Sequence, residues 1–414
     1  MRLARAVACA LSLAASGCGS VTHGVAPADA PESAPSEGAT RDGTPDGPDP
    51  LEAPGEPYAW QAATRSPQPA PPPRDELARA CTKHDAALDR VAAFVAERER
   101  TKGAAADADL VTDAMRAEGA PYVWPHVWVL SGKRLGDDAP ARFGEWLGSL
   151  PRVNELRCGS ALARGANGEI AVGVATDVLA DVDALPTDAR PGAWLDVSAR
   201  MLVATSAAEV LVLGPRGAPH AVPTSFDGGR VRARFNVDRE GPWLVQVLAT
   251  VEGGPRPVAE AVVFGGAAPT TLAPSRPAPG ENAAQALAPA DALAAMVNAA
   301  RESEGLEQLT RDARLDRVAQ AHAEMMRDTH RLAHEGSDGA PADRVAAAGI
   351  AVSAVGENVA HAADAKHAHR TLWQSPSHRS NLLETHFDAL GVGVARDADD
   401  TLWVCEVFAG LAAH

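Results

Sequence analysis

Four short blocks near the C-terminus constrain this chain more than any other feature, because each combines uncommon residues in a fixed order. They read Leu-Ala-His-Glu-Gly at 332–336, Ala-Gly-Ile at 348–350, Gly-Glu-Asn-Val-Ala at 356–360 and Ser-Pro-Ser-His-Arg-Ser-Asn at 375–381. Their histidines, glutamates and serines carry side chains that exchange protons or form hydrogen bonds. We therefore expect a functional site in this part of the chain.

In order and spacing, these blocks resemble the bacterial branch of the CAP superfamily, also called SCP domains. That superfamily includes the cysteine-rich secretory proteins, the antigen five allergens and the pathogenesis-related plant proteins. The resemblance covers about 290–410 and implies an α/β/α sandwich with a central cavity lined by two histidines and two acids. On motif position the cavity residues are His334, Glu357 and His378, and Ser375 stands where the second acid is expected.

Three kinds of chemistry fit these residues. A binding module would hold a cell-surface ligand in the cleft; lipids and sterols bind some relatives, and cell-wall components suit the location. Alternatively, His334 and His378 could hold zinc, with Glu357 as the base in a hydrolase of peptide or ester bonds. Two histidines are one ligand fewer than most catalytic zinc sites offer, so binding is favoured. A hydrogen-bond network in which Glu357 orients both histidines is the structural alternative, and it is favoured over catalysis. A hydrolase triad of Ser375, His378 and Glu357 lacks the nucleophile-elbow sequence of such enzymes.

The start of the chain is typical of an exported lipoprotein. Two arginines precede an apolar run, and Ala-Ser-Gly-Cys follows at 15–18. This pattern predicts a signal peptide over 1–17 and a lipid on Cys18, with an ordinary signal peptide as the alternative. Gly19 is not aspartate, which by resemblance to lipoproteins implies the outer of two membranes.

The remaining chain carries no run of the ~18 apolar residues that a membrane span needs. Its formal net charge of −16 argues against nucleic acid as a partner. We therefore expect a soluble, extracytoplasmic body that is anchored to the membrane through Cys18.

Three of the five cysteines lie in this body: Cys81, Cys158 and Cys405. In an oxidising compartment Cys81 and Cys158 could form a disulfide and leave Cys405 unpaired. Three reduced thiols are the alternative. Because Cys405 lies in a predicted strand, we expect it to be a small buried residue rather than a nucleophile.

Composition divides the chain and predicts a multidomain α+β protein. The parts are a disordered Pro/Ala-rich tether at 18–74, a globular α/β segment at 75–185, an immunoglobulin-like β-sandwich at 191–265, a linker at 266–284 and the CAP domain at 285–411. The sandwich is predicted from the alternation of apolar and polar residues between Gly-rich turns.

The C-terminal domain shows both helical and strand spacing of apolar residues. These patterns predict helices around 293–300, 315–326, 342–348 and 364–374, and strands at 390–396 and 401–408. A separate tract of His361, His367 and His369 does not set one ligand face, and we expect it to be solvated surface.

The segment 75–185 resembles the C-terminal domain. Its residues 85–92 are identical to 312–319 at seven of eight positions, and five residues within 159–172 match residues within 391–404. This predicts a degenerate CAP-like copy that has kept the scaffold and lost the cavity residues. Chance similarity between Ala-rich and Arg-rich helices is the alternative.

In this degenerate copy we expect apolar side chains to fill the equivalent of the cleft. The predicted plug consists of Trp124, Val127, Trp128 and Leu130. Buried apolar side chains of this size each contribute ~1.5 to 3 kcal/mol, whereas an empty polar cleft contributes nothing.

Overall fold

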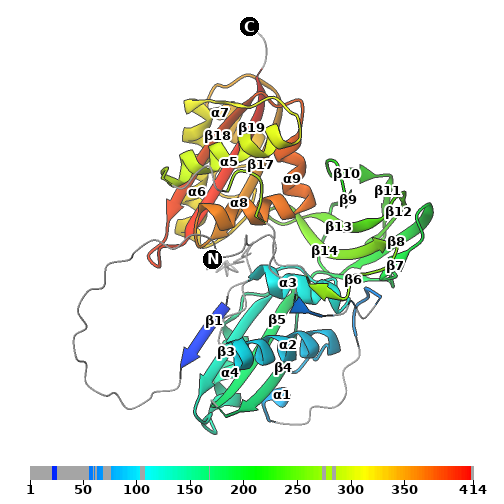
Figure 1. The fold of residues 1–414 in the computed structure, drawn as a ribbon. Coiled ribbons are helices and arrows are strands. Elements are labelled where there is room, and N and C mark those ends of the chain that lie inside the picture. The colour runs from blue at the N-terminus through cyan, green and yellow to red at the C-terminus, as the bar shows by residue number, and fades with distance from the viewer. Residues whose placement is uncertain are drawn as a thin grey trace, which may run out of the picture.

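The computed structural model describes residues 21–25, 56–58, 60, 63–68, 76–102, 108–166, 168–272, 277–281 and 286–411. These residues form an N-terminal α/β domain, a middle unit of two β-sheets and a C-terminal α/β domain (Figure 1). Within the described part, no helix is both long enough and apolar enough for a membrane span. The predicted signal peptide at 1–17 and the predicted lipid site at Cys18 lie outside the described residues.

The N-terminal domain is a sheet with helices on both faces. Its elements are α1 (Glu76–Ala80), α2 (Ala86–Lys102), α3 (Ala108–Ala117), β3 (His126–Gly132), α4 (Ala139–Ser149), β4 (Glu155–Gly165) and β5 (Gly168–Val178). The sheet order is β1-β3-β5-β4, and β1 (Val21–Val25) pairs in parallel with β3. Leu88 of α2 packs on one face, and Phe143 of α4 packs on the other.

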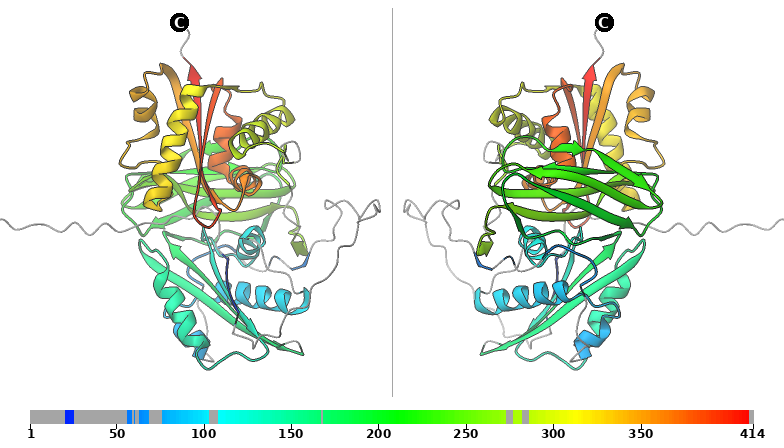
Figure 2. Two further views of the ribbon diagram at one scale, coloured as in Figure 1. Left: turned by 90° about the vertical axis from the view of Figure 1, so that its left-hand side faces the viewer. Right: turned by 90° about the vertical axis from the view of Figure 1, so that its right-hand side faces the viewer.

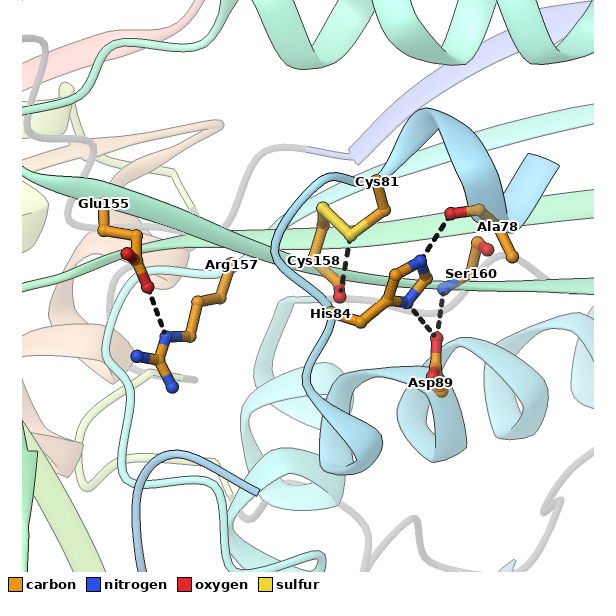
Figure 3. Close-up of a disulfide and its surroundings, with 8 residues drawn as sticks. All are labelled: Ala78, Cys81, His84, Asp89, Glu155, Arg157, Cys158 and Ser160. Atoms are coloured by element: carbon orange, nitrogen blue, oxygen red, sulfur yellow. Dashed lines mark hydrogen bonds and ion pairs between the residues drawn. A yellow bond between two sulfur atoms is a disulfide. The ribbon is translucent and has the colours of Figure 1, made fainter. Parts of the chain in front are cut away.

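A disulfide between Cys81 and Cys158 fastens the end of α1 to β4 (Figure 3). The structure thus decides in favour of the disulfide and against three reduced thiols. Cys405 is free and buried, as predicted.

The four predicted plug residues do not form one cluster. Val127 packs with α2, whereas Trp128 and Leu130 pack on the opposite face of the sheet. Trp124 packs against the core of the middle unit. Because neighbouring residues of a strand point to opposite faces, such a run cannot fill a single cleft.

The middle unit consists of two sheets that share one apolar core. One sheet has the order β10-β9-β13-β14-β7 and the other β11-β12-β8-β6. The strands are β6 (Ala180–Val182), β7 (Asp188–Ala189), β8 (Ala193–Met201), β9 (Ala207–Leu213), β10 (His220–Val222), β11 (Thr224–Asp227), β12 (Arg230–Val237), β13 (Gly241–Val251) and β14 (Gly254–Gly265). The sheets therefore begin at Ala180, earlier than the predicted start at 191.

Parts of the predicted tether at 18–74 and of the predicted linker at 266–284 are ordered against the domains. The strand β2 (Glu56–Pro57) pairs with β15 (Thr271–Leu272). Leu272 is buried in the core of the N-terminal domain. The predictions of a disordered tether and a free linker are therefore wrong for these residues, because each contributes apolar area or ladder hydrogen bonds to a neighbouring unit.

The C-terminal domain is a four-stranded sheet of order β16-β18-β19-β17 between helices (Figure 2). Its elements are α5 (Pro289–Ser303), β16 (Thr310–Arg311), α6 (Ala313–Thr329), α7 (Pro341–Ala347), β17 (Val352–Ala362), α8 (Ala365–Gln374), α9 (Pro376–Leu383), β18 (Ala389–Arg396) and β19 (Leu402–Leu411). One core lies under α6, and a second lies under α5, α8 and α9.

The four predicted helices of this domain and its two predicted strands are confirmed. Asp364 caps α8 by accepting a hydrogen bond of 2.9 Å from the backbone of His367. The strand β17 and the helix α9 are absent from the prediction. The cause is the Gly-Glu-Asn sequence in β17, which interrupts the apolar alternation, and the short length of α9.

Candidate functional site

Glu357 lies at the centre of the site, on the edge strand β17. Its side chain is buried and accepts a hydrogen bond of 3.0 Å from Nδ1 of His334 and a further one from Arg344. Burial alone would raise the pKa of Glu357, but the hydrogen bond from His334 and the charge of Arg344 outweigh it, and the pKa lies below its ordinary value. Glu357 is therefore a carboxylate at neutral pH.

Arg344 and His322 are functional residues that the sequence prediction missed. Arg344 of α7 donates to the carbonyl of His334 at 3.0 Å as well as to Glu357, and so fixes the loop that carries His334. His322 is fully buried, with Nδ1 2.7 Å from the carboxylate of Asp338 and Nε2 2.9 Å from the carbonyl of Ala333. Both neighbours are oxygen acceptors, and together they fix the orientation of the His322 ring.

Sequence signals for these two residues exist but are weak. His322 is a histidine on an otherwise apolar helix face, and Arg344 is a basic residue in an Ala-rich helix. A polar side chain on a buried helix face needs a partner, but spacing alone does not name that partner.

His378 and Ser375 form a second hydrogen-bonded pair, at the start of α9. Nδ1 of His378 lies 2.9 Å from Oγ of Ser375. Gln246 of the middle unit reaches the same place, because its Nε2 donates to Ser375 Oγ at 3.2 Å and its Oε1 accepts from the backbone of Ser377 at 3.0 Å. Burial lowers the pKa of His378 to about 3, and the neighbouring His334 adds to the shift. The ring of His378 is therefore neutral at physiological pH.

Asn358, the residue after Glu357, joins the two pairs. Its amide donates to the carbonyl of His378 and to the carboxylate of Glu406, both at 3.2 Å. Asn381 in turn donates to Asn358 at 3.0 Å. Because neighbouring residues of a strand point to opposite faces, Glu357 orients His334 while Asn358 holds the helix of His378.

The two pairs meet at a cavity of about 140 Å³ that all three units line. His334, Ser375 and His378 line it from the C-terminal domain. Trp124 contributes from the N-terminal domain and Arg256 from the middle unit. Glu357 does not line the cavity but lies beneath His334.

Comparison with known proteins matches residues 294–407 to the family model CAP, described as the cysteine-rich secretory protein family. The C-terminal domain is a CAP domain. The uncharacterised protein YkwD of Bacillus subtilis is 32% identical to this chain over 100 residues, which are 24% of this chain and 39% of YkwD. The chain thus spans well under half the length of this curated relative.

Solved structures similar to the chain share little sequence with it. An outer surface protein from Borrelia burgdorferi is 19% identical, with 30% of this chain and 93% of that chain covered and a TM-score of 0.29. An extracellular protein with an SCP domain from Bacillus anthracis is also 19% identical, with 52% and 81% covered and a TM-score of 0.27. A cysteine-rich secretory protein from Staphylococcus aureus is 12% identical, with 57% and 81% covered and a TM-score of 0.26.

The geometry of the CAP domain does not assemble the predicted hydrolase triad. Ser375 and His378 are within hydrogen-bonding distance, but Glu357 is bonded to His334 and Arg344 instead of His378. For zinc, the described residues contain no group of three or more His, Cys, Asp or Glu side chains that could hold a metal ion.

The three histidines of the separate tract in the CAP domain point to different partners. His361 stacks on the ring of Trp403 at 4.2 Å, and His367 is exposed. His369 is fully buried, with Nε2 3.0 Å from the carbonyl of Pro279. The prediction of solvated surface is therefore wrong for His369, because the segment before the CAP domain covers it.

Proposed function

We propose that this chain is an extracytoplasmic binding protein that holds a small ligand in the cavity between its CAP domain and the other two units. The observation that carries the proposal is the cavity itself, which His334, Ser375 and His378 line. Apolar and polar groups converge there, as is typical of ligand sites.

Binding is favoured over catalysis by the state of the polar groups. Both oxygens of Glu357 already accept hydrogen bonds, and its side chain is shielded from the cavity. A carboxylate held in this way orients His334 and is poorly placed to activate a water molecule. No observation favours the zinc hydrolase.

A matched pair of tryptophan variants tests ligand binding. Thr112 of α3 lines the cavity, whereas Thr101 is exposed on α2. We expect neutral, fluorinated fragments of one-ring size to bind the wild type, as followed by ¹⁹F NMR line broadening. Thr112→Trp should fill the cavity and abolish this binding, and Thr101→Trp should leave it intact. Failure of every fragment to bind the wild type would remove the proposal.

The predicted lipid anchor is part of the same proposal. The Ala-Ser-Gly-Cys box and the disulfide between Cys81 and Cys158 support an oxidising, extracytoplasmic location. We expect Cys18→Ser to move the protein from the membrane fraction to the soluble fraction. A wild-type protein that fractionates as soluble and unlipidated would contradict the anchor.

We also infer that the N-terminal α/β domain is a degenerate CAP-like copy. In both domains three antiparallel strands occur in the same spatial order, β3-β5-β4 and β17-β19-β18. In both, a long helix with the shared Asp-Ala-x-Leu-Asp-Arg-Val-Ala sequence crosses the sheet, α2 in one and α6 in the other.

Corresponding atoms make the same contacts in the two domains. Asp89 accepts a hydrogen bond of 2.9 Å from the backbone of Ser160 (Figure 3), and Asp316 accepts one of 2.8 Å from the backbone of Val392. The preceding glycine of each strand lies directly against the helix backbone, where a Cβ atom would overlap the residue before the aspartate. Chance similarity of Ala-rich helices would not reproduce these contacts.

A further inference from the structure

Two arginines face the cavity without a counter-ion. Arg256 follows the β13–β14 turn, and Arg331 follows α6; both line the cavity. In each, Nε is buried and has no hydrogen-bond partner among the described residues. Neither guanidinium forms an ion pair with another described residue, and for Arg256 the one opposing charge is that of Asp177. A guanidinium Nε that is buried without a partner loses its hydration and gains no hydrogen bond in return.

The other charged groups of the cavity wall are neutralised or lie at its rim. Arg116 is paired with Glu260 at 2.6 Å. Asp109 lies 3.9 Å from Arg370. Glu252 is exposed at the tip of the β13–β14 turn. Arg256 and Arg331 are therefore the cations of the cavity wall that no ion pair among the described residues neutralises, although the chain as a whole has a net charge of −16.

Arg256 is held in a fixed plane by an aromatic ring. Its guanidinium lies 3.9 Å from the centre of the Trp124 ring. Trp124 itself has a φ of 55°, a left-handed conformation that is uncommon for a bulky residue. Burial lowers the pKa of Arg256 to about 10, and only Asp177 opposes the shift. The group remains a cation at neutral pH, oriented and partly stripped of water.

Docking of the middle unit on the CAP domain brings the two arginines to one cavity. The carbonyl of Gly253, at the tip of the β13–β14 turn, accepts hydrogen bonds from the backbones of His334 at 3.1 Å and Glu335 at 3.0 Å. A Cβ atom on Gly253 would lie 3.4 Å from Cβ of Ala333 and 4.0 Å from Arg331. The turn therefore seats closely on the segment that carries Arg331.

We propose that Arg256 and Arg331 form the anion-binding end of the cavity and select a small carboxylate whose apolar body is about the size of one ring. This inference rests on the proposed function, since it names the class of ligand for the same cavity. Guanidinium groups match carboxylates in geometry. A volume of about 140 Å³ is close to that of an engineered cavity that takes up benzene, ~150 Å³.

The test compares 4-fluorobenzoate with its neutral counterpart 4-fluorobenzamide on the full chain, by ¹⁹F NMR. In the wild type we expect the benzoate to bind at least tenfold more tightly, because charge-assisted hydrogen bonds are the stronger class. This difference should disappear in Arg256→Gln and in Arg331→Gln. It should persist in Arg232→Gln, an exposed arginine of the middle unit that does not line the cavity.

Other results of this experiment would overturn this inference, the proposed function or both. Equal binding of the two probes by the wild type would overturn this inference and leave the proposed function standing. Failure of both probes, and of the neutral fragments, would overturn both. Inorganic phosphate that displaces the benzoate at equal concentration would overturn the choice of a carboxylate with an apolar body. Unchanged benzoate binding in folded Arg256→Gln and Arg331→Gln would remove the assignment of these residues.

Discussion

The N-terminal α/β domain and the CAP domain have three antiparallel strands in the same spatial order, but they differ at one position of the first of these strands. In the CAP domain Glu357 pairs with Val407, which pairs with Gly391. In the N-terminal domain the same ladder runs from Val127 through Val174 to Gly159. Val127 therefore occupies the place of Glu357.

This difference shows that a single residue of this strand determines whether the position belongs to an apolar core or to a polar site. Val127 is buried against α2 and contributes by apolar burial, ~1.5 to 3 kcal/mol. Glu357 is equally buried, and it requires His334 and Arg344 to compensate its charge. The scaffold thus tolerates either residue only together with its partners. The strand pairing also corrects the sequence alignment of the two domains, because the residue equivalent to Val172 is Cys405 rather than Val404.

Removing the cation beside Glu357 should produce the largest effect. We expect Arg344→Met to destabilise the CAP domain by about 3–5 kcal/mol, because it leaves a buried carboxylate with less compensation. Urea denaturation followed by CAP-domain signals would measure this. Arg327→Met, at a partly exposed arginine paired with Asp328, is the matched control. Adding Glu357→Gln to Arg344→Met should restore part of the loss; no restoration would show that charge is not the cause.

The second-largest effect is expected from removal of the disulfide, and it should be confined to the N-terminal domain. Among the described residues, the N-terminal domain alone has such a link, between residues 77 positions apart. We expect the double variant Cys81→Ser, Cys158→Ser to lose about 2–4 kcal/mol in that domain, because the unfolded chain is no longer constrained. Hydrogen exchange resolved by domain is the measurement. Equal loss of protection in the CAP domain would show that the two domains unfold as one unit.

The close approach of helix and strand should behave alike in both copies. We expect Gly159→Ala and Gly391→Ala each to cost about 3 kcal/mol, because the added methyl group overlaps helix backbone. Gly144→Ala in α4 is the control, since nothing lies within 4 Å of its added methyl group. Thermal unfolding of the three variants would measure the effect. A large effect in only one copy would break the proposed equivalence.

The smallest expected effect concerns pH and is confined to the CAP domain. Burial raises the pKa of Glu406 to about 7, whereas the equivalent ladder position in the N-terminal domain is Gly173. Because the folded state holds this proton more tightly than the unfolded chain, Glu406 contributes its full stability at pH values below the ordinary carboxyl pKa. This contribution is lost as the pH rises from there through about 7.

Between pH 5 and pH 7 we therefore expect the wild type to lose on the order of 2 kcal/mol relative to Glu406→Gln. Urea midpoints at both pH values give the difference, and Glu145→Gln at an exposed position is the control. A constant difference between wild type and Glu406→Gln would contradict the raised pKa.

Sequence patterns anticipated local features well. The apolar faces of α5 and α6 and the cap at Asp364 follow from spacing and from one side chain, so they need no distant partner. The motif blocks also located His334, Ser375 and His378, which line one cavity. The strand β17 was missed because its polar site residues interrupt the alternation of apolar and polar residues that is typical of a half-buried strand.

By itself, the sequence determined the elements that depend on neighbours a few residues away, and the residue types at the motif positions. The tertiary structure alone decided which partners those residues have. His334 and Arg344 donate hydrogen bonds to Glu357, and Gln246 reaches Ser375 from another unit. The free energy of a buried polar group depends on what lies within a few ångströms in space. That distance is set by the packing of three units, and no spacing along the chain encodes it.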